Sequence, residues 1–322
     1  MSESDAALII EQPGLAMSIQ GRPWRNMRHH GIPLAGPVDP IACAMANWLA
    51  GNPAGSPALE WAVSRFTGHA ATDIVIGIAG GVGNVVVNAK LQDSRRTLRL
   101  TEGDHFSISP ARHGARLYLA VAGGFAVDTV LGATSTYATA GLGTAADWSM
   151  EEGDSLPVRP SSKPVTDRIL PQNARQSFSA NYVLRYVATD VASEEADTAS
   201  LTSAWLVTSR FDRAAVQLRP ETSESVNHFQ QNTSGTMPSN AVFPGTIQIP
   251  PDGQPLLMGV DCRTTGGYAV AGQIIRADRQ LLGQLRSGDK VELIATSAEK
   301  AREIYTEKLE LWRRYLPDLR LD

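Results

Sequence analysis

Two short apolar segments lead into the polar run Asp261-Cys262-Arg263-Thr264-Thr265-Gly266-Gly267-Tyr268. The segments, 245–249 and 256–260, are predicted to be β-strands because each is a short apolar run bounded by turn residues, with Pro-Pro-Asp-Gly between them. The polar run therefore begins at a strand end, where polar side chains can converge without interrupting a core. We interpret it as the wall of a small-molecule site.

In the rest of the chain, Gly and Pro also separate short segments, as is typical of a β-protein. Short runs rich in β-forming residues occur at 73–78, 85–88 and 182–187, and 28 Gly and 19 Pro separate such runs. This spacing is typical of barrels or sandwiches. Gly-rich residues 79–83 are predicted to form a tight turn and not a dinucleotide loop, because the residues that follow form a strand pattern and not a helix.

A Gly-Asp turn occurs three times before alternating apolar positions. The copies begin at Glu102, Glu152 and Ser287. Glycine allows the positive φ of such a turn, and the alternation predicts a strand with one buried face. The unequal separations of the copies indicate related β units and not a solenoid.

One helix is predicted at 40–50. Asp39 is a good N-cap, Pro40 fits the first helical position and Gly51 can close the helix. The apolar side of this helix contains Ile41, Met45, Trp48 and Leu49.

A second helix is predicted at 297–315, entered through a capping box of Thr296 and Glu299. Its apolar side is expected to pack on a barrel or on a partner. That side contains Ala301, Ile304, Tyr305, Leu309, Trp312 and Leu316.

The stretch 156–172 contains four prolines and little periodicity, which is typical of an interdomain link. We therefore expect an N-terminal β-barrel domain at 1–160 and a C-terminal domain at 161–322. The polar residues 221–240 are expected to form a long loop that orders when substrate or a partner binds.

Composition excludes several classes of protein. The chain has 322 residues, and 43% of them are hydrophobic, so it can bury one large core or two ordinary ones. A net charge of −4 lacks the excess positive charge that is typical of nucleic-acid-binding proteins. Its apolar runs are broken before the roughly 20 residues of a membrane span, and the N-terminus is acidic where a secretory signal is basic. We expect a soluble, cytoplasmic protein with no nucleic-acid or membrane partner.

The two cysteines, Cys43 and Cys262, are too few for a disulfide framework and have no metal-type spacing, so no metal site is expected. Cys43 lies on the predicted helix and is interpreted as a buried thiol. For Cys262, packing is favoured over a nucleophilic role, which would need an electropositive, accessible setting.

The chain resembles the biotin-dependent carboxyltransferase family, whose members include allophanate hydrolase subunit 2 and the C subunit of bacterial ATP-dependent 5-oxoprolinase. The stretch 245–268 carries one part of the resemblance. Residues 31–40, Gly-Ile-Pro-Leu-Ala-Gly-Pro-Val-Asp-Pro, are similar to the family signature G-(V/I)-P-x-(S/A)-G-P-(M/V)-D. Further blocks follow in the family order at 46–52, 59–60, 118–124 and 131–136.

Several polar positions depart from the family pattern. Arg263 replaces a Gln and Ala269 replaces a Pro, and Gln20 is followed directly by Gly21-Arg22 without the usual acidic residue. Residues 79–82, 143–148 and 211–215 also differ. A different substrate, or a subunit without catalysis, therefore remains open.

The candidate site follows from the residues and from the resemblance together. The Arg263 guanidinium can clamp a carboxylate, while hydroxyls and glycine amides can stabilise a carbonyl oxygen that gains charge. Catalysis is assigned to Arg263, Thr264, Thr265, Tyr268 and Asp39. Substrate binding is assigned to His30, Gly36, Pro37, Gln248, Gly266, Gly267 and Arg213.

Each assignment has a structural alternative. The polar run could be a hydrogen-bonded turn with an exposed Arg263, and Asp39 could serve only as an N-cap. Arg213 could form a surface ion pair with Asp212, and His30 could be an ordinary surface histidine.

The resemblance implies two cyclophilin-like β-barrels in a mainly β chain with a few helices. It also implies one member of an ATP-dependent 5-oxoprolinase-type complex that acts on a small lactam or amide. Its partners would be a 5-oxoprolinase B subunit, of the allophanate hydrolase subunit 1 type, and a 5-oxoprolinase A subunit. The complex would use ATP, which this chain shows no sign of binding. The alternatives are a carboxyltransferase acting on urea or a related amide, with biotin on a separate protein, and a regulatory binding subunit without catalysis.

Overall fold

The computed structural model describes residues 6–143, 150–161, 164–189, 201, 204–221, 238–317 and 319. The chain divides into two compact units. Unit 1 comprises Met1–Arg25, Ala35–Phe178 and Trp312–Asp322, and unit 2 comprises Asn26–Leu34 and Ser179–Leu311. These bounds differ from the predicted 1–160 and 161–322, because the main boundary lies after Phe178, a short N-terminal segment joins unit 2 and the C-terminal segment joins unit 1.

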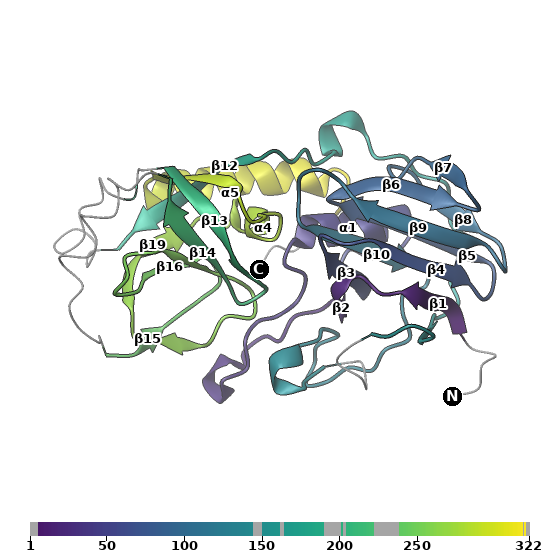
Figure 1. Ribbon diagram of the computed structural model, residues 1–322, viewed down its shortest axis with the longest axis horizontal. Helices are drawn as coiled ribbons and strands as arrows, with labels where there is room; N and C mark the ends of the chain where they lie inside the picture. Colours follow the sequence, from purple (N-terminus) through teal and green to yellow (C-terminus); the bar gives the residue numbers. More distant parts are fainter. Residues whose placement is uncertain are drawn as a thin grey trace. The chain divides into compact units, whose positions relative to one another are not determined.

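Unit 1 is built on two antiparallel sheets (Figure 1). The six-stranded sheet has the order β11-β1-β4-β9-β6-β7, and the five-stranded sheet has the order β2-β3-β10-β5-β8. The strands of the first sheet are β1 (Ala6–Gln12), β4 (Phe66–Ala70), β6 (Val82–Val87), β7 (Lys90–Gln92), β9 (His105–Pro110) and β11 (Ser155–Pro157). Those of the second are β2 (Leu15–Gln20), β3 (Ala58–Ala62), β5 (Ile74–Gly80), β8 (Leu98–Leu100) and β10 (Arg116–Val121).

The main core of unit 1 lies between these two sheets. Alternate residues of β10 pack into two different apolar cores. Leu117, Leu119 and Val121 belong to the core shared with the six-stranded sheet. Tyr118 and Ala120 point the other way and pack in the core around helix α1 (Pro40–Leu49). All six residues of β10 are therefore buried.

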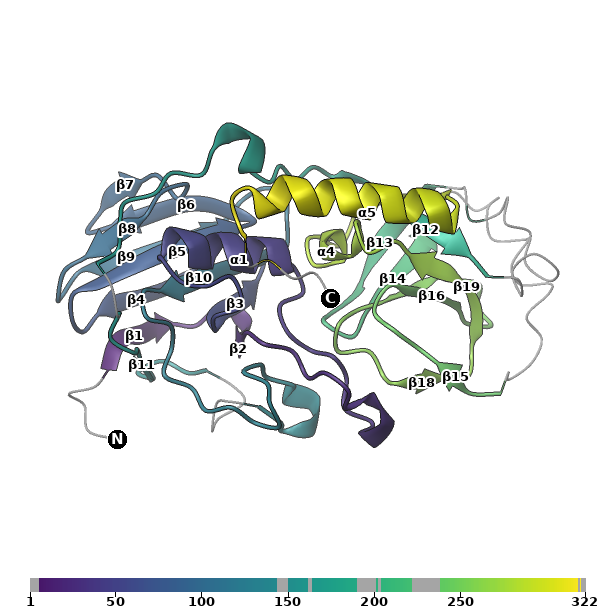
Figure 2. The ribbon, with the colours of Figure 1, turned by 180° about the vertical axis from the view of Figure 1, so that it is seen from behind.

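Helix α1 forms the third layer of unit 1, and Figure 2 shows it against the five-stranded sheet. Its bounds confirm the predicted helix. Asp39 is the N-cap and accepts from the backbone N–H groups of Ile41 and Ala42, and Pro40 is at the first helical position. Gly51 follows the helix with a φ of +82°.

Unit 2 is a closed barrel of seven strands in the order β12-β19-β16-β17-β14-β13-β20. Its interior is filled by one apolar core around Tyr186, Trp205 and Leu218. The barrel strands are β12 (Asn181–Ala188), β13 (Ala204–Phe211), β14 (Ala215–Pro220), β16 (Thr246–Ile249), β17 (Leu256–Met258), β19 (Ala269–Ile274) and β20 (Lys290–Ala295). The mainly β class is confirmed, and the predicted strands before Asp261 are β16 and β17.

Shorter elements complete the described fold. A two-stranded ribbon pairs β15 (Asn240–Ala241) with β18 (Thr265–Gly266). The remaining helices are α4 (Arg279–Leu282), α5 (Ala298–Arg313) and the 3-10 turns η2 (Arg28–His30), η3 (Ala138–Ala140) and η4 (Gln172–Ala174).

The three Gly-Asp turns share one geometry. Gly103, Gly153 and Gly288 all have positive φ, near +83°, +90° and +89°. In each turn the Asp carboxylate accepts from the backbone N–H three residues earlier, as Asp104 does from Thr101 and Asp289 does from Arg286. The strands β9, β11 and β20 follow, which confirms the prediction.

Two predicted features differ from the structure. Helix α5 is capped by Ser297, whose Oγ accepts from the Lys300 N–H, so the predicted cap at Thr296 is wrong by one residue. The stretch 156–172 packs within unit 1 instead of linking two domains. Its Leu156 pairs with β1, and Leu170 is buried and donates its N–H to the Arg95 carbonyl.

Most of the predicted loop 221–240, and most of the segment 143–148 that departs from the family pattern, lie outside the described residues. Within the described residues, no helix combines the length and the apolar character that crossing a membrane would require.

Gly77 is essential to the contact between α1 and β5. A Cβ at this position would lie 2.1 Å from the Ala46 carbonyl oxygen and 2.7 Å from the Leu49 Cβ. We expect Gly77→Ala to lower the free energy of unfolding by about 1–3 kcal/mol, because the rigid backbone of α1 must move. Urea unfolding measures this cost.

Gly55→Ala is the matched control. Gly55 is exposed, and no atom lies within 4 Å of its added Cβ. Equal stability losses for the two variants would contradict close packing of α1 on β5.

Candidate functional site

The predicted site residues divide between the two units. Gly36, Pro37 and Asp39 belong to unit 1. The others, His30, Arg213, Gln248 and the run 263–268, all belong to unit 2. The expectation that both groups belong to one site stays a prediction.

The segment Gly36–Asp39, which we call the elbow, is hydrogen-bonded to two buried polar side chains. Glu60 and Tyr118 lie directly opposite each other in the β3–β10 ladder. The Tyr118 hydroxyl donates to Glu60 Oε2 at 2.7 Å, and the same oxygen accepts from the Val38 N–H at 2.9 Å. The Asp39 N–H donates to the Tyr118 hydroxyl at 2.8 Å. This network fixes the path of the elbow.

The Asp39 carboxylate is not open to solvent. It is 0% exposed. Oδ1 caps α1, and Oδ2 accepts from Gln176 Nε2 at 3.1 Å. The N-cap role is confirmed, and a catalytic role for Asp39 stays a prediction. Gly36 is buried with a φ of +84°, which explains the glycine, and Pro37 is half-buried.

Burial also sets the protonation of this network. Burial first, and then the nearby Glu60 and Asp39 carboxylates, raise the pKa of Tyr118 well above its ordinary value. Tyr118 therefore stays a phenol and can donate to Glu60. Burial and the same two carboxylates raise the pKa of the Cys43 thiol, which confirms the buried, inert thiol expected on this helix.

Two asparagines of the family-like blocks have structural partners. Asn47 Nδ2 donates to the Ser56 carbonyl, and Asn52 Nδ2 donates to Asn47 Oδ1 and to the Val121 carbonyl. Asn52 Oδ1 accepts from the Gly123 N–H. These bonds join the C-terminal end of α1 to the end of β10.

In unit 2, the polar run begins with a buried ion pair. Arg213 donates to both Asp261 oxygens, at 2.8 and 3.0 Å, and both side chains are largely buried. The surface pair of Asp212 and Arg213, one of the alternatives that the sequence left open, is therefore not formed in the described residues. Asp212 instead accepts from the N–H groups of Ala214 and Ala215 in the turn. A bidentate buried pair fixes where the run 261–268 starts.

Arg28 reaches the same run from the N-terminal segment of unit 2. Its Nη2 donates to the Val242 carbonyl and, at 3.5 Å, to the Thr264 carbonyl, and its guanidinium stacks on Phe243 at 4.9 Å. Its Nη1 is buried and has no hydrogen-bond partner within the described part of the chain. His30, two residues along, is exposed, and its ring lies 3.9 Å from that of His29.

Gln248 faces Gly266. A Cβ added to Gly266 would lie 2.6 Å from Gln248 Nε2, so glycine is required for this close approach. Gln248 is only 3% exposed, and its Nε2 has no hydrogen-bond partner among the residues that the structure describes. A buried donor without a partner costs about 1–3 kcal/mol, unless a ligand supplies the acceptor.

Cys262 is 0% exposed and lies near the guanidinium groups of Arg28 and Arg279 and the carboxylate of Asp261. Burial raises the pKa of Cys262 to about 11, while the nearby Arg28 guanidinium acts in the opposite direction. Burial and the neighbouring Arg276 lower the pKa of Arg279 to about 10, so Arg279 is still a cation at neutral pH. Neither Arg28 nor Arg279 has a carboxylate partner within the described residues.

Three predicted catalytic side chains are open to solvent. Arg263, Thr265 and Tyr268 are exposed, and Thr264 is half-buried. No hydrogen bond or ion pair of the Arg263 guanidinium occurs among the described residues. This geometry allows a ligand clamp, and it also allows an exposed arginine on a turn, so the roles of these residues stay predictions.

We call the polar groups around this run the donor cluster, and define it as Arg28, Gln248, Arg263 and Arg279. Its three arginines have no carboxylate partner in the described residues, and two of its buried nitrogens, Arg28 Nη1 and Gln248 Nε2, have no acceptor there. Its chemical complement is therefore a carboxylate or an amide carbonyl oxygen. Arg28 and Arg279 are not among the site residues predicted from the sequence. Neither has a distinguishing spacing, because only the tertiary fold brings them to Cys262.

A surface hollow of about 680 Å³ lies elsewhere in unit 1. Trp48, Asn52 and Arg168 line it at the C-terminal end of α1, and the Arg168 guanidinium stacks on Trp48 at 5.0 Å. Since α1 has ten residues, Asp39 lies about 15 Å away along the helix axis. The hollow is therefore separate from the predicted elbow site.

Residues 30–295 match the family described as carboxyltransferase domain, subdomain A and B. The match includes the elbow, the family-like blocks and the polar run. The chain belongs to this family.

Three relatives show the range of the carboxyltransferase-domain family. The chain is 30% identical to the C subunit of 5-oxoprolinase from Escherichia coli over 91% of this chain and 93% of that protein. It is 25% identical to urea amidolyase of Lachancea kluyveri over 92% of this chain. It also has the fold of the Kluyveromyces lactis urea carboxylase, with a TM-score of 0.85 and 23% identity over 98% of this chain.

The coverage of these relatives differs. The chain spans 17% of the Lachancea kluyveri urea amidolyase and 30% of the solved urea carboxylase chain. It therefore corresponds to one region of those larger proteins, whereas it matches nearly the whole of the bacterial 5-oxoprolinase protein.

The thiols offer a test of the local environments. With a pKa of about 11, roughly 0.1% of Cys262 is thiolate at pH 8, compared with about a quarter for an ordinary thiol. The raised pKa of Cys43 acts in the same direction. We expect native protein at pH 8 to react with iodoacetamide at least about 100-fold more slowly than a free thiol, as followed by mass spectrometry.

The same protein unfolded in guanidinium is the control, and there both thiols should be alkylated. Rapid alkylation of Cys262 in the folded chain would contradict the packing role and revive the nucleophilic one.

Proposed function

We propose that this chain is the C-type component of a 5-oxoprolinase-type complex that opens a small lactam or amide at the expense of ATP. A B-type partner and an A-type partner would complete the complex and supply ATP binding. The relationship to the bacterial C-type protein, over nearly the full length of both chains, supports this role. In this proposal the donor cluster binds the substrate.

One observation carries the choice of substrate class. Arg28 and Arg279 are cations without carboxylate partners in the described part of the chain, and Gln248 Nε2 is a buried donor without an acceptor. A 5-oxoproline molecule offers a carboxylate and a lactam carbonyl, whereas urea is neutral. The carboxylate would be held by guanidinium groups, and a donor directed at the lactam oxygen would stabilise the charge that develops there.

The second candidate is a carboxyltransferase acting on urea or a related amide. The family description and the similarity to urea amidolyase favour it. Carboxylated biotin on a separate protein would then be the anionic substrate, and the cations of the donor cluster would bind its carboxylate. The carboxyltransferase would require bicarbonate and biotin, whereas the 5-oxoprolinase-type complex would not.

Co-expression with B-type and A-type partners encoded by adjacent genes tests the proposal. We expect 5-oxoproline to stimulate ATP hydrolysis by the purified complex, with glutamate formed in equal amount. The activity should be lost without this chain and should be insensitive to avidin. Avidin inhibition with a bicarbonate requirement would support the carboxyltransferase, and full turnover without this chain would indicate a regulatory role.

Two substitutions test the donor cluster in that complex. Arg263→Ala and Gln248→Leu should each raise KM for the substrate about 10-fold, because each loses one hydrogen bond to a charged or polarised oxygen. Neither should lower Tm, since Arg263 is exposed and Gln248→Leu removes a buried donor that has no partner in the described residues. Steady-state kinetics and thermal unfolding measure both quantities.

Arg210→Ala is the matched control for Arg263→Ala, because Arg210 is also an exposed arginine of unit 2. If KM is unchanged in both donor-cluster variants and the complex is still active on 5-oxoproline, the substrate-binding role of these residues is wrong. The proposed function of the complex would then still stand.

A further inference from the structure

A second group of polar side chains lies on the outer face of the six-stranded sheet in unit 1. Glu11 comes from β1, His69 from β4 and His105 from β9. His69 and His105 are directly opposite each other in the β4–β9 ladder. Their strand neighbours Phe66, Gly68 and Phe106 point inward, so the histidines face solvent.

The three ligand atoms converge. Glu11 Oε1 lies 2.6 Å from His105 Nδ1 and 3.1 Å from His69 Nδ1, and the two rings are 5.2 Å apart. One ligand atom of each residue lies within 4.8 Å of the other two. In a tetrahedral site with bonds of about 2.0–2.2 Å, ligand atoms are about 3.4 Å apart. The two Glu11–histidine separations would therefore have to lengthen by only about 0.3–0.8 Å to match this geometry.

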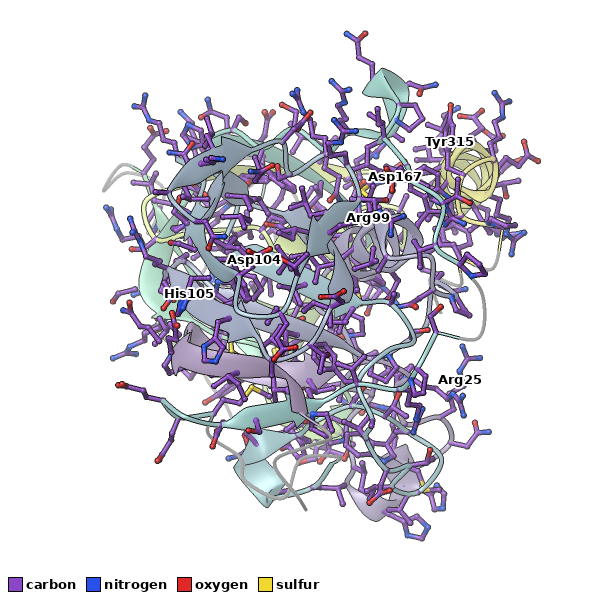
Figure 3. All side chains as sticks on the ribbon, turned by 90° about the vertical axis from the view of Figure 1, so that its right-hand side faces the viewer. Arg25, Arg99, Asp104, His105, Asp167 and Tyr315 are labelled. Atoms are coloured by element: carbon purple, nitrogen blue, oxygen red, sulfur yellow. The ribbon has the colours of Figure 1, made fainter. Side chains whose placement is uncertain are left out.

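The backbone around this group is already fixed. The His105 N–H donates to Asn88 Oδ1, and the Asn88 N–H donates to the His105 carbonyl. The Asn88 side chain also binds the Asp104 carboxylate, which belongs to the Gly-Asp turn. Figure 3 shows His105 beside Asp104. On β1, a register irregularity between Ile10 and Gln12 sets the position of Glu11.

We propose that Glu11, His69 and His105 form a binding site for a divalent transition-metal ion of the Zn²⁺ class. Imidazole nitrogens suit Zn²⁺, Cu²⁺ and Ni²⁺, whereas Ca²⁺ and Mg²⁺ take oxygen ligands. Three protein ligands leave a fourth position open to water or to an external ligand. Partial exposure, 34% for the Glu11 side chain and 64% for that of His105, gives the ion an entry path.

This site is independent of the proposed function. None of its ligands belongs to the donor cluster, which lies in unit 2. Sequence spacing did not predict it, because residues 11, 69 and 105 come from three separate strands and meet only when the sheet forms.

Isothermal titration of the full, untagged chain with ZnCl₂ tests the proposal. We expect one Zn²⁺ per chain, and no binding of Mg²⁺ or Ca²⁺ at the same concentrations. Glu11→Gln and His105→Asn should each weaken Zn²⁺ binding about 10-fold or more. Co²⁺ should give a visible absorption band that both variants lose.

His29→Asn with His30→Asn is the matched control, because these histidines are exposed and their rings are 3.9 Å apart. This double variant should bind Zn²⁺ as the wild type does. The proposal is overturned if the wild type does not bind Zn²⁺, if Glu11→Gln binds it with unchanged affinity, or if the double variant is the one that loses it. Because Glu11 and His105 are at the surface, circular dichroism should show both variants folded.

Discussion

The carboxylate of Glu60 is the constraint on which the arrangement of unit 1 depends. One of its oxygens accepts from the Tyr118 hydroxyl and from the Val38 N–H, so strand β3, strand β10 and the elbow before α1 are tied to one buried atom. A buried carboxylate is costly unless several donors satisfy it. The same network orients Asp39, whose carboxylate caps α1. Removing one donor would therefore leave the buried carboxylate of Glu60 partly unsatisfied, and that group would carry the desolvation cost.

This network gives a physical meaning to the motifs of the family. The Gly-Pro-Val-Asp elbow, the Leu-Glu pair on β3 and the Tyr at 118 are separated in the sequence but join in one hydrogen-bonded group. Asn47 and Asn52 have a similar role at the other end of α1. These motif residues position backbone in unit 1, so their presence identifies the fold more directly than it identifies a reaction.

In unit 2 the candidate site residues lie next to a buried ion pair that has a structural role. The Asp261–Arg213 pair satisfies both partners in a bidentate geometry and fixes the start of the polar run. Beyond it, the Arg28 and Gln248 side chains each keep a buried nitrogen without a partner in the described residues. Folded proteins rarely leave such groups unsatisfied, and a ligand oxygen is one way to explain their retention. The cysteine among them is buried and poorly ionised, which separates it from this chemistry.

The sequence by itself determined the mainly β class, helix α1 with its Asp39 cap, the three Gly-Asp turns and the family. These features depend on local chemistry, such as capping, positive φ at glycine and alternation along a strand. Only the tertiary structure decided that Arg213 pairs with Asp261 and not with Asp212, that Asp39 is buried, and that Arg28 joins Cys262 in unit 2. It also brought Glu11, His69 and His105 together. Contacts between residues far apart in the chain depend on strand order and register, and neither is encoded in any short stretch of residues.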